Sequence, residues 1–163
     1  MDLRPTKEMR DLIAEHPFFQ DMDPQYLDLL AGCARNVRFM PDEMVFREGE
    51  PADAFYLIRH GKVLIGVQVP GRGLVPIQTL GPGEMIGWSW LFPPHRWHFD
   101  AKALEVTRAL AFDATCLRSK CDEDPRLGYQ LMRRFAAMLI ERLQAARMQL
   151  LDMYGVHTAQ PGP

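Results

Sequence analysis

The spacing of apolar residues along the chain changes twice. Near the N-terminus it is helical: Thr6 to Glu15 predicts a short helix, and a second helix begins at Asp23-Pro24 and ends at Gly32. From Asn36 apolar and polar residues alternate in short runs, which is typical of strands that are buried on one face. After Pro125 the helical spacing returns. The pattern predicts a mainly β protein with flanking helices.

Turn residues divide the alternating part into strands. Pro41-Asp42-Glu43, His60-Gly61-Lys62 and Pro70-Gly71-Arg72-Gly73 are turn sequences between apolar runs. We expect an antiparallel, jelly-roll-like β-roll of eight strands, and the sequence places seven of them, at residues 37–39, 44–46, 54–58, 63–69, 74–80, 99–103 and 107–112. The expected organisation is N-terminal helices in 1–35, the β-roll in 36–113, C-terminal helices in 114–155 and a loose Pro/Gly-rich tail in 156–163.

The last predicted helix carries an apolar stripe in a three-four alternation. The helix begins at Asp124-Pro125, ends before Gly155 and would be about 45 Å long, more than a domain of this size needs for its own core. Such a stripe is a heptad seam and favours a homodimer of parallel helices. The stripe begins at Tyr129, and the predicted dimer residues within it are Met132, Ala136, Leu139, Leu143, Ala146, Leu150 and Met153. A second stripe, Leu127, Leu131, Phe135 and Met138, would face the roll.

Charge and composition exclude several classes of function. The net charge is −2, so the chain has no basic footprint for nucleic acid. It has no apolar run of membrane-spanning length and no signal-peptide pattern, and we expect a cytoplasmic protein. The three cysteines, Cys33, Cys116 and Cys121, lack zinc-site spacing, and we expect reduced thiols.

The segment from Gly83 to Ala103 contains the candidate chemistry, because it holds all three tryptophans, two histidines and one arginine. Its aromatic residues could form a cage for a cationic or planar ligand, or they could fill the pocket themselves. His95 and His98 lack further ligands at metal-site spacing, so we predict no metal. No nucleophilic triad or dyad is apparent, and we predict no enzyme. The candidate pocket residues are Gly87, Trp88, Ser89, Trp90, His95, Arg96, Trp97 and His98.

The run from Phe39 to Val69 resembles the first half of a cyclic-nucleotide-binding domain of the catabolite-activator (Crp/Fnr) type. The matching sequences are Pro41-Asp42-Glu43, Phe46 to Asp53, and Tyr56-Leu57-Ile58 followed by Gly61-Lys62-Val63. Leu80 to Glu84 with Ile86-Gly87 resembles the turn that enters the family's phosphate-binding cassette. The resemblance covers about Pro17 to Tyr154 and implies the β-roll fold and a sensor or regulatory role.

The resemblance also implies where the nucleotide anchors should stand. In the family a Gly-Glu pair holds the ribose hydroxyl and an arginine holds the cyclic phosphate. Aligned through the glycines, Trp88 takes the place of the glutamate, and His95 takes the place of the arginine, with Arg96 one residue away. A second register, ranked lower, puts Gly83-Glu84 on the sugar. An indole only donates hydrogen bonds, and a neutral imidazole cannot clamp a phosphate.

Three functions follow as hypotheses. The first is a stand-alone dimeric sensor or regulatory module with an altered nucleotide site. The second is a working cyclic AMP or cyclic GMP sensor, and the third is a protein-interaction scaffold with a self-filled pocket and an unidentified partner. No cofactor is certain; the ligand could be a cyclic nucleotide or another small anionic or aromatic molecule. Relatives that regulate transcription continue into a helix-turn-helix domain, which is missing after Tyr154, so we expect no direct DNA binding.

Overall fold

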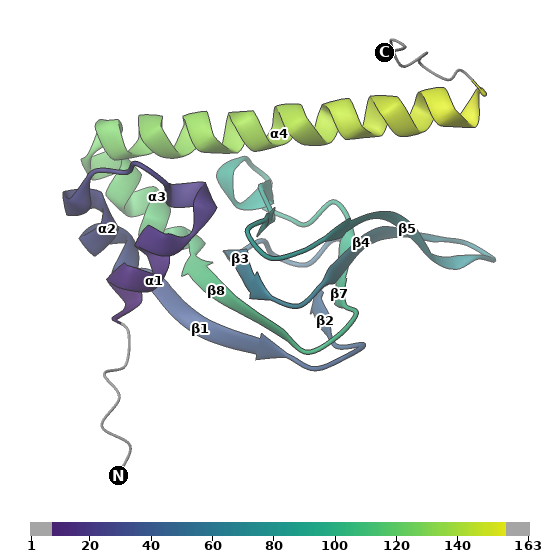
Figure 1. The fold of residues 1–163 in the computed structure, drawn as a ribbon, viewed down its shortest axis with the longest axis horizontal. Helices are drawn as coiled ribbons and strands as arrows, with labels where there is room; N and C mark the ends of the chain where they lie inside the picture. The colour runs from purple at the N-terminus through teal and green to yellow at the C-terminus, as the bar shows by residue number, and fades with distance from the viewer. Residues whose placement is uncertain (1–7, 156–163) are drawn as a thin grey trace, which may run out of the picture. The chain divides into compact units, whose positions relative to one another are not determined.

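The computed structural model describes residues 8–155 and divides the chain into two compact units, which are described separately. The first unit ends at Gly128 and contains the sheets; the second begins at Tyr129 and continues the last helix. Figure 1 shows the strands of the first unit and the short helices that precede them. Within residues 8–155, no helix combines the length and the apolar character that crossing a membrane requires.

Short helices precede the sheets. They are α1 (Met9–Glu15), the 3-10 turn η1 (Pro17–Phe19) and α2 (Pro24–Ala31). Pro24 stands at the first position of α2, where its missing N–H costs nothing, and Gly32 follows the last turn. An aspartate at this position also predicts a side-chain cap for α2, and this expectation is wrong, because the side chain of Asp23 makes no capping hydrogen bond. The expected α2 boundaries are confirmed.

Eight antiparallel strands form two four-stranded sheets, which confirms the predicted β-roll. The first sheet has the order β1-β8-β3-β6 and the second β2-β7-β4-β5. The strands are β1 (Ala34–Phe39), β2 (Met44–Phe46), β3 (Ala54–His60), β4 (Val63–Val69), β5 (Gly73–Leu80), β6 (Met85–Ile86), β7 (Asp100–Ala103) and β8 (Thr107–Asp113). The strand that the sequence does not place is β6, whose two residues are too few to show alternation. It pairs with Tyr56 and Leu57 of β3.

The core of the first unit contains residues from both sheets. On the first sheet β3 is buried almost throughout, with Phe55, Leu57 and Ile58 at 0 % exposure. On the second sheet Ala101 and Ala103 of β7 are fully buried, while Lys102 between them is half-buried. This alternation is what a strand with one buried face requires. Helix α3 (Ala114–Glu123) follows β8, and Asp113 caps it by accepting the N–H of Cys116 at 2.7 Å.

The expectation of reduced thiols is wrong for two cysteines, because Cys33 and Cys116 form a disulfide. They are 83 positions apart in sequence, and pairing of β1 with β8 brings them together. Cys33 directly precedes β1, and its carbonyl accepts the N–H of Asp113, at 2.9 Å, where β8 ends. Spacing could not predict this pair, since strand pairing creates the proximity. Cys121 is a free thiol.

The last helix, α4 (Pro125–Met153), has 29 residues, which corresponds to about 44 Å. Its second apolar stripe is buried at Leu127, Leu131 and Phe135. The predicted seam is different: Leu143 is 61 % and Met153 83 % exposed. Among the other seam residues Met132, Ala136, Ala146 and Leu150 are exposed, and Leu139 is half-buried. Ile140 and Met148, which lie outside the seam, are exposed as well.

Candidate functional site

The candidate site is the segment between β6 and β7, which we call the cassette (residues 87–99). It contains one short 3-10 turn, η2 (Ser89–Leu91), followed by an irregular arm. A cis peptide bond joins Pro93 and Pro94, and His95 adopts a positive φ of 55°. This arm does not start a long helix, and its shape is set by contacts with a neighbouring loop.

The neighbouring loop is residues 47–52, between β2 and β3. Three backbone hydrogen bonds join it to the cassette arm: Gly49 N–H to the Trp97 carbonyl (2.9 Å), Trp97 N–H to the Glu50 carbonyl (3.0 Å), and Ala52 N–H to the His95 carbonyl (2.7 Å). Pro51 and Arg96 form an isolated antiparallel bridge at the same place. The cassette arm is therefore fastened to this loop by its backbone.

Behind the loop lies Asp100, the first residue of β7, which is only 2 % exposed. Its carboxylate accepts the N–H of Glu48 at 2.7 Å and the side-chain amide of Gln68 at 3.0 Å. Bonds from two neutral donors satisfy this buried acid, which holds the start of the loop against β4.

The indole of Trp97 fills the space above Gly87. It is 3 % exposed and stacks on Phe46, with ring centroids 3.7 Å apart and planes at 6°. A Cβ added to Gly87 would lie 2.5 Å from the Trp97 ring, and Gly87 has a φ of 98°. Only glycine combines this backbone conformation with so close an approach of a ring.

The aromatic residues of the cassette separate into two groups. One group, which we call the cradle cluster, consists of Phe46, Trp88, Trp97 and Phe99. The ring centroids of Trp88 and Phe99 are 4.9 Å apart, and those of Phe99 and Phe46 are 5.9 Å apart. Trp90 belongs elsewhere: it is fully buried and stacks on Phe55 at 5.1 Å. The second group, the core cluster, comprises Phe18, Phe19, Phe55, Trp90 and Phe112. Phe92 is in neither group, being 52 % exposed.

The polar candidates lie on the outside of the cassette. The guanidinium of Arg96 is exposed and donates to the carbonyl of Gly49 at 2.7 Å, so its cation is directed at the loop. His98 is exposed, and its Nδ1 lies 3.0 Å from the hydroxyl of the buried Ser89. His95 is half-buried and contributes its carbonyl to the loop. Within residues 8–155 no group of three or more His, Cys, Asp or Glu side chains is placed to hold a metal ion.

Glu84, the acid of the second sequence register, serves a turn. Its carboxylate accepts the N–H of Gly81 at 3.2 Å, and the side chain is exposed. Since the acid already closes the turn before β6, it has a local structural role.

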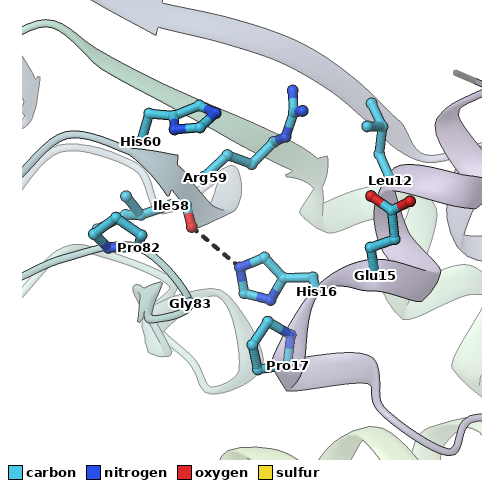
Figure 2. Close-up of a pocket in the computed structure, with 9 residues that line it drawn as sticks. All are labelled: Leu12, Glu15, His16, Pro17, Ile58, Arg59, His60, Pro82 and Gly83. Atoms are coloured by element: carbon cyan, nitrogen blue, oxygen red, sulfur yellow. Dashed lines mark hydrogen bonds between the residues drawn. The ribbon is translucent and has the colours of Figure 1, made fainter.

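A groove not predicted from the sequence lies beside this turn. It has a volume of about 360 Å³ and includes His16, Pro17, Ile58, Arg59 and Gly83 in its lining (Figure 2). His16 is buried, accepts the N–H of Phe18 at Nδ1 (3.2 Å), and lies with Nε2 3.2 Å from the Ile58 carbonyl. A carbonyl only accepts, so Nε2 carries the proton. Burial lowers the pKa of His16; the bond to Ile58 acts against the shift, and nearby Arg59 adds to it.

Comparison with known proteins identifies the family. The model of the cyclic nucleotide-binding domain matches residues 36–124, which is more than half of the chain. The chain belongs to this family. It is 31 % identical over 154 residues to a CRP-like cAMP-activated global transcriptional regulator of Mycobacterium tuberculosis, covering 94 % of this chain and 66 % of that protein. The match therefore spans somewhat less than two thirds of the regulator's length.

Solved structures agree with the fold. A cyclic nucleotide-binding domain from Methylobacillus flagellatus has a TM-score of 0.75 at 20 % identity and covers 96 % of this chain and 84 % of its own. The catabolite activator protein of Thermus thermophilus has a TM-score of 0.66 at 26 % identity, and the match covers 85 % of this chain and 63 % of that protein. The cyclic nucleotide-binding domain thus forms most of the chain, and its cassette lies between β6 and β7.

Proposed function

We propose that this domain acts as a sensor or regulatory module in which the nucleotide site is altered, so that cyclic AMP and cyclic GMP bind weakly. The observation that supports the altered site is the position of Trp97. Its ring lies over Gly87 and against Phe46, where it is 3 % exposed. A ligand entering this part of the cassette has to displace a stacked, buried ring. The role proposed is binding, without catalysis.

The chemistry of the anchors supports the same conclusion. Trp88 and His95 occupy the positions at which the family resemblance expects an acid and an arginine. A hydrogen bond to a charged group contributes roughly 1.5–3 kcal/mol, so two lost anchors weaken binding by about two to four decades. Arg96 carries the charge that His95 lacks, but its guanidinium is engaged by the Gly49 carbonyl. A phosphate would have to draw it away.

Titration of cyclic AMP and cyclic GMP, followed by tryptophan fluorescence and checked by calorimetry, tests the proposal. We expect dissociation constants weaker than about 100 µM, from the two lost anchors. Trp97→Ala is the matched variant, because it removes the ring that lies over Gly87 and leaves Trp88, His95 and Arg96 unchanged. Saturable binding to the wild-type protein below about 10 µM would overturn the altered site. Loss of such binding in Arg96→Ala would then place the phosphate at Arg96.

Two alternatives have support of their own. An ordinary cyclic-nucleotide sensor is favoured by the 31 % identity to a cAMP-activated regulator and by the presence of Arg96 one residue from the expected position. An interaction scaffold with a self-filled pocket is favoured by the burial of Phe46, Trp97 and Phe99. Nucleotide titration separates the first alternative from the proposal. A screen against a metabolite library separates the proposal from the scaffold, which should bind nothing in the cassette.

We further propose that the module is a homodimer formed through the seam of α4. The support is the exposure of Leu143, Leu150 and Met153, which belong to a heptad stripe. In a monomer these apolar side chains would stay exposed to water. Leu143→Asp places an unpaired charge in that stripe and should convert a dimer to a monomer on a sizing column at micromolar concentration. Gln144→Asp adds the same charge at the neighbouring exposed position, outside the seam, and should leave the dimer intact. A monomeric wild-type protein would refute the dimer.

A further inference from the structure

The disulfide joins two parts of the first unit that differ in accessibility. Cys33, at the junction of α2 and β1, is 6 % exposed, whereas Cys116 in the first turn of α3 is half-buried. The Cα atoms of the two residues are 5.7 Å apart, within the usual range for a disulfide. Cys116 is therefore the more exposed of the two bonded residues, and it is the side of the bond that we expect an external thiol to attack.

The same helix also holds the cassette. Arg118, two residues after Cys116, donates from Nη1 to the carbonyl of Trp90 at 2.6 Å. Trp90 is the fully buried residue of η2, and Leu117 beside Arg118 is fully buried as well. Helix α3 is thus held on one side by a covalent bond to the α2–β1 junction. On the other side it holds the backbone of the cassette by a charged hydrogen bond.

We propose that Cys33–Cys116 is a reversible thiol–disulfide site, and that its redox state controls how firmly α3 holds the cassette. The reductant is a dithiol, either small or on a protein. One thiolate of the dithiol attacks the Cys116 sulfur, the bond to Cys33 breaks, and Cys33 leaves as a thiolate that takes up a proton. The second thiol of the dithiol then displaces Cys116. The dithiol becomes a disulfide, and the protein gains two electrons and two protons.

The physical consequence follows from the position of the bond. When it is broken, α3 keeps the Asp113 cap and the buried Leu117, but it loses its only covalent connection to the α2–β1 junction. Arg118 then donates to the Trp90 carbonyl from a helix that is less restrained. We expect the cassette backbone between Trp88 and His98 to open more often in the reduced protein, without loss of the fold.

Cys121 does not take part while α3 is intact. Five residues of helix separate it from Cys116, which places the two side chains about 140° apart around the axis. Burial, with Asp122 and Asp124 nearby, raises the pKa of the Cys121 thiol and so reduces its thiolate fraction. Cys121 can therefore serve as an internal reference thiol.

The first measurement is a thiol count in denaturant on protein purified in air, with peptide mapping. We expect one thiol before reduction, from Cys121, and three after treatment with dithiothreitol. The second is hydrogen exchange by mass spectrometry. Residues 88–98 should exchange about tenfold faster in the reduced protein, while β3 stays protected. Neither readout requires a nucleotide, so the result is independent of the proposed function.

Three variants isolate the cause. Cys121→Ser should leave the redox difference unchanged. Cys116→Ser should show the fast exchange with or without dithiothreitol. Arg118→Gln in the oxidised protein should loosen residues 88–98 while the disulfide remains, because it removes the charged donor to Trp90.

Three results would overturn the proposal. Three free thiols before reduction would mean that the disulfide does not form. Equal exchange of residues 88–98 in both states would mean that the bond does not influence the cassette. Loss of the β-sheet circular dichroism signal on reduction would mean that the disulfide is required for the fold and does not regulate the cassette.

Discussion

The core cluster and the cradle cluster both contain a tryptophan from one short stretch of sequence, yet the two rings are held in different ways. Trp90 stacks on Phe55, which in turn stacks on Phe112 at 4.6 Å, so its neighbours come from β3 and β8 of one sheet. Trp97 stacks on Phe46 and lies over a glycine, next to a loop joined to it by backbone hydrogen bonds. The comparison shows that two buried rings of one segment can be held by different means, one by paired strands and the other by a loop and a glycine.

Replacing each ring by alanine should give the largest effects and should separate the clusters. Trp90→Ala should lower the free energy of unfolding by about 4 kcal/mol, because its neighbours belong to paired strands that cannot collapse. Trp97→Ala should lower it by about 2 kcal/mol, since the adjacent loop can relax. Urea denaturation followed by circular dichroism measures both.

Phe92→Ala is the matched control for these variants. The side chain is 52 % exposed and in neither cluster, so the change should stay within about 0.5 kcal/mol. Equal losses for Trp90→Ala and Trp97→Ala would remove the distinction between the clusters. Only Trp97→Ala should create a site for a small planar dye in the cradle.

Gly87→Ala should have an intermediate effect, confined to the cradle cluster. The variant forces alanine to a φ of 98° and brings its Cβ to 2.5 Å from the Trp97 ring, which should destabilise the protein by about 1–3 kcal/mol. In the Trp97→Ala background, the part of this destabilisation that comes from the clash with the ring should disappear. The part that comes from the positive φ should remain. The difference between the two backgrounds measures the contact between Gly87 and Trp97.

Gly71→Ala provides the backbone reference. Its φ is 79° and nothing lies within 4 Å of an added Cβ, so only the conformational cost remains. If Gly87→Ala destabilised the protein no more than Gly71→Ala, the claim that the Trp97 ring leaves no room for a side chain at Gly87 would be wrong.

The smallest effect concerns pH and the core cluster, which His16 supports by accepting the N–H of Phe18. Burial lowers the pKa of His16 from 6.5, so the folded protein binds fewer protons than the unfolded chain between the lowered pKa and 6.5. The stability associated with neutral His16 is complete above pH 6.5 and is lost as the pH falls towards the lowered value. Urea midpoints measured from pH 8 to pH 5 should therefore decrease.

His16→Asn is the matched control, because the Asn side-chain oxygen can accept the same N–H but does not titrate in this range. The variant should lose less stability than the wild-type protein between pH 6.5 and 5, whatever its stability at pH 8. Parallel pH profiles for the two proteins would show that His16 does not titrate at a lowered pKa.

Much of the fold follows from local pattern. Alternation and turn residues predicted seven of the eight strands, and Asp113 is a residue type that favours a helix cap and forms one at the start of α3. The missing strand, β6, has only two residues and exists because β3 lies beside it. The Cys33–Cys116 bond was not predicted for a similar reason, since β1 and β8 pair residues that are 68 to 78 positions apart in sequence.

The sequence by itself determined most of the elements and the stretch that holds the candidate chemistry, because periodicity, capping and turn preferences act over a few residues. The resemblance of its turn and strand motifs indicated the family. Tertiary structure alone decided how the side chains of that stretch are arranged. It placed Trp90 and Trp97 in different clusters, directed Arg96 to the Gly49 carbonyl, and brought a disulfide within two residues of the arginine that holds the cassette. These outcomes depend on contacts between residues distant in sequence, and such contacts exist only once the sheets have formed.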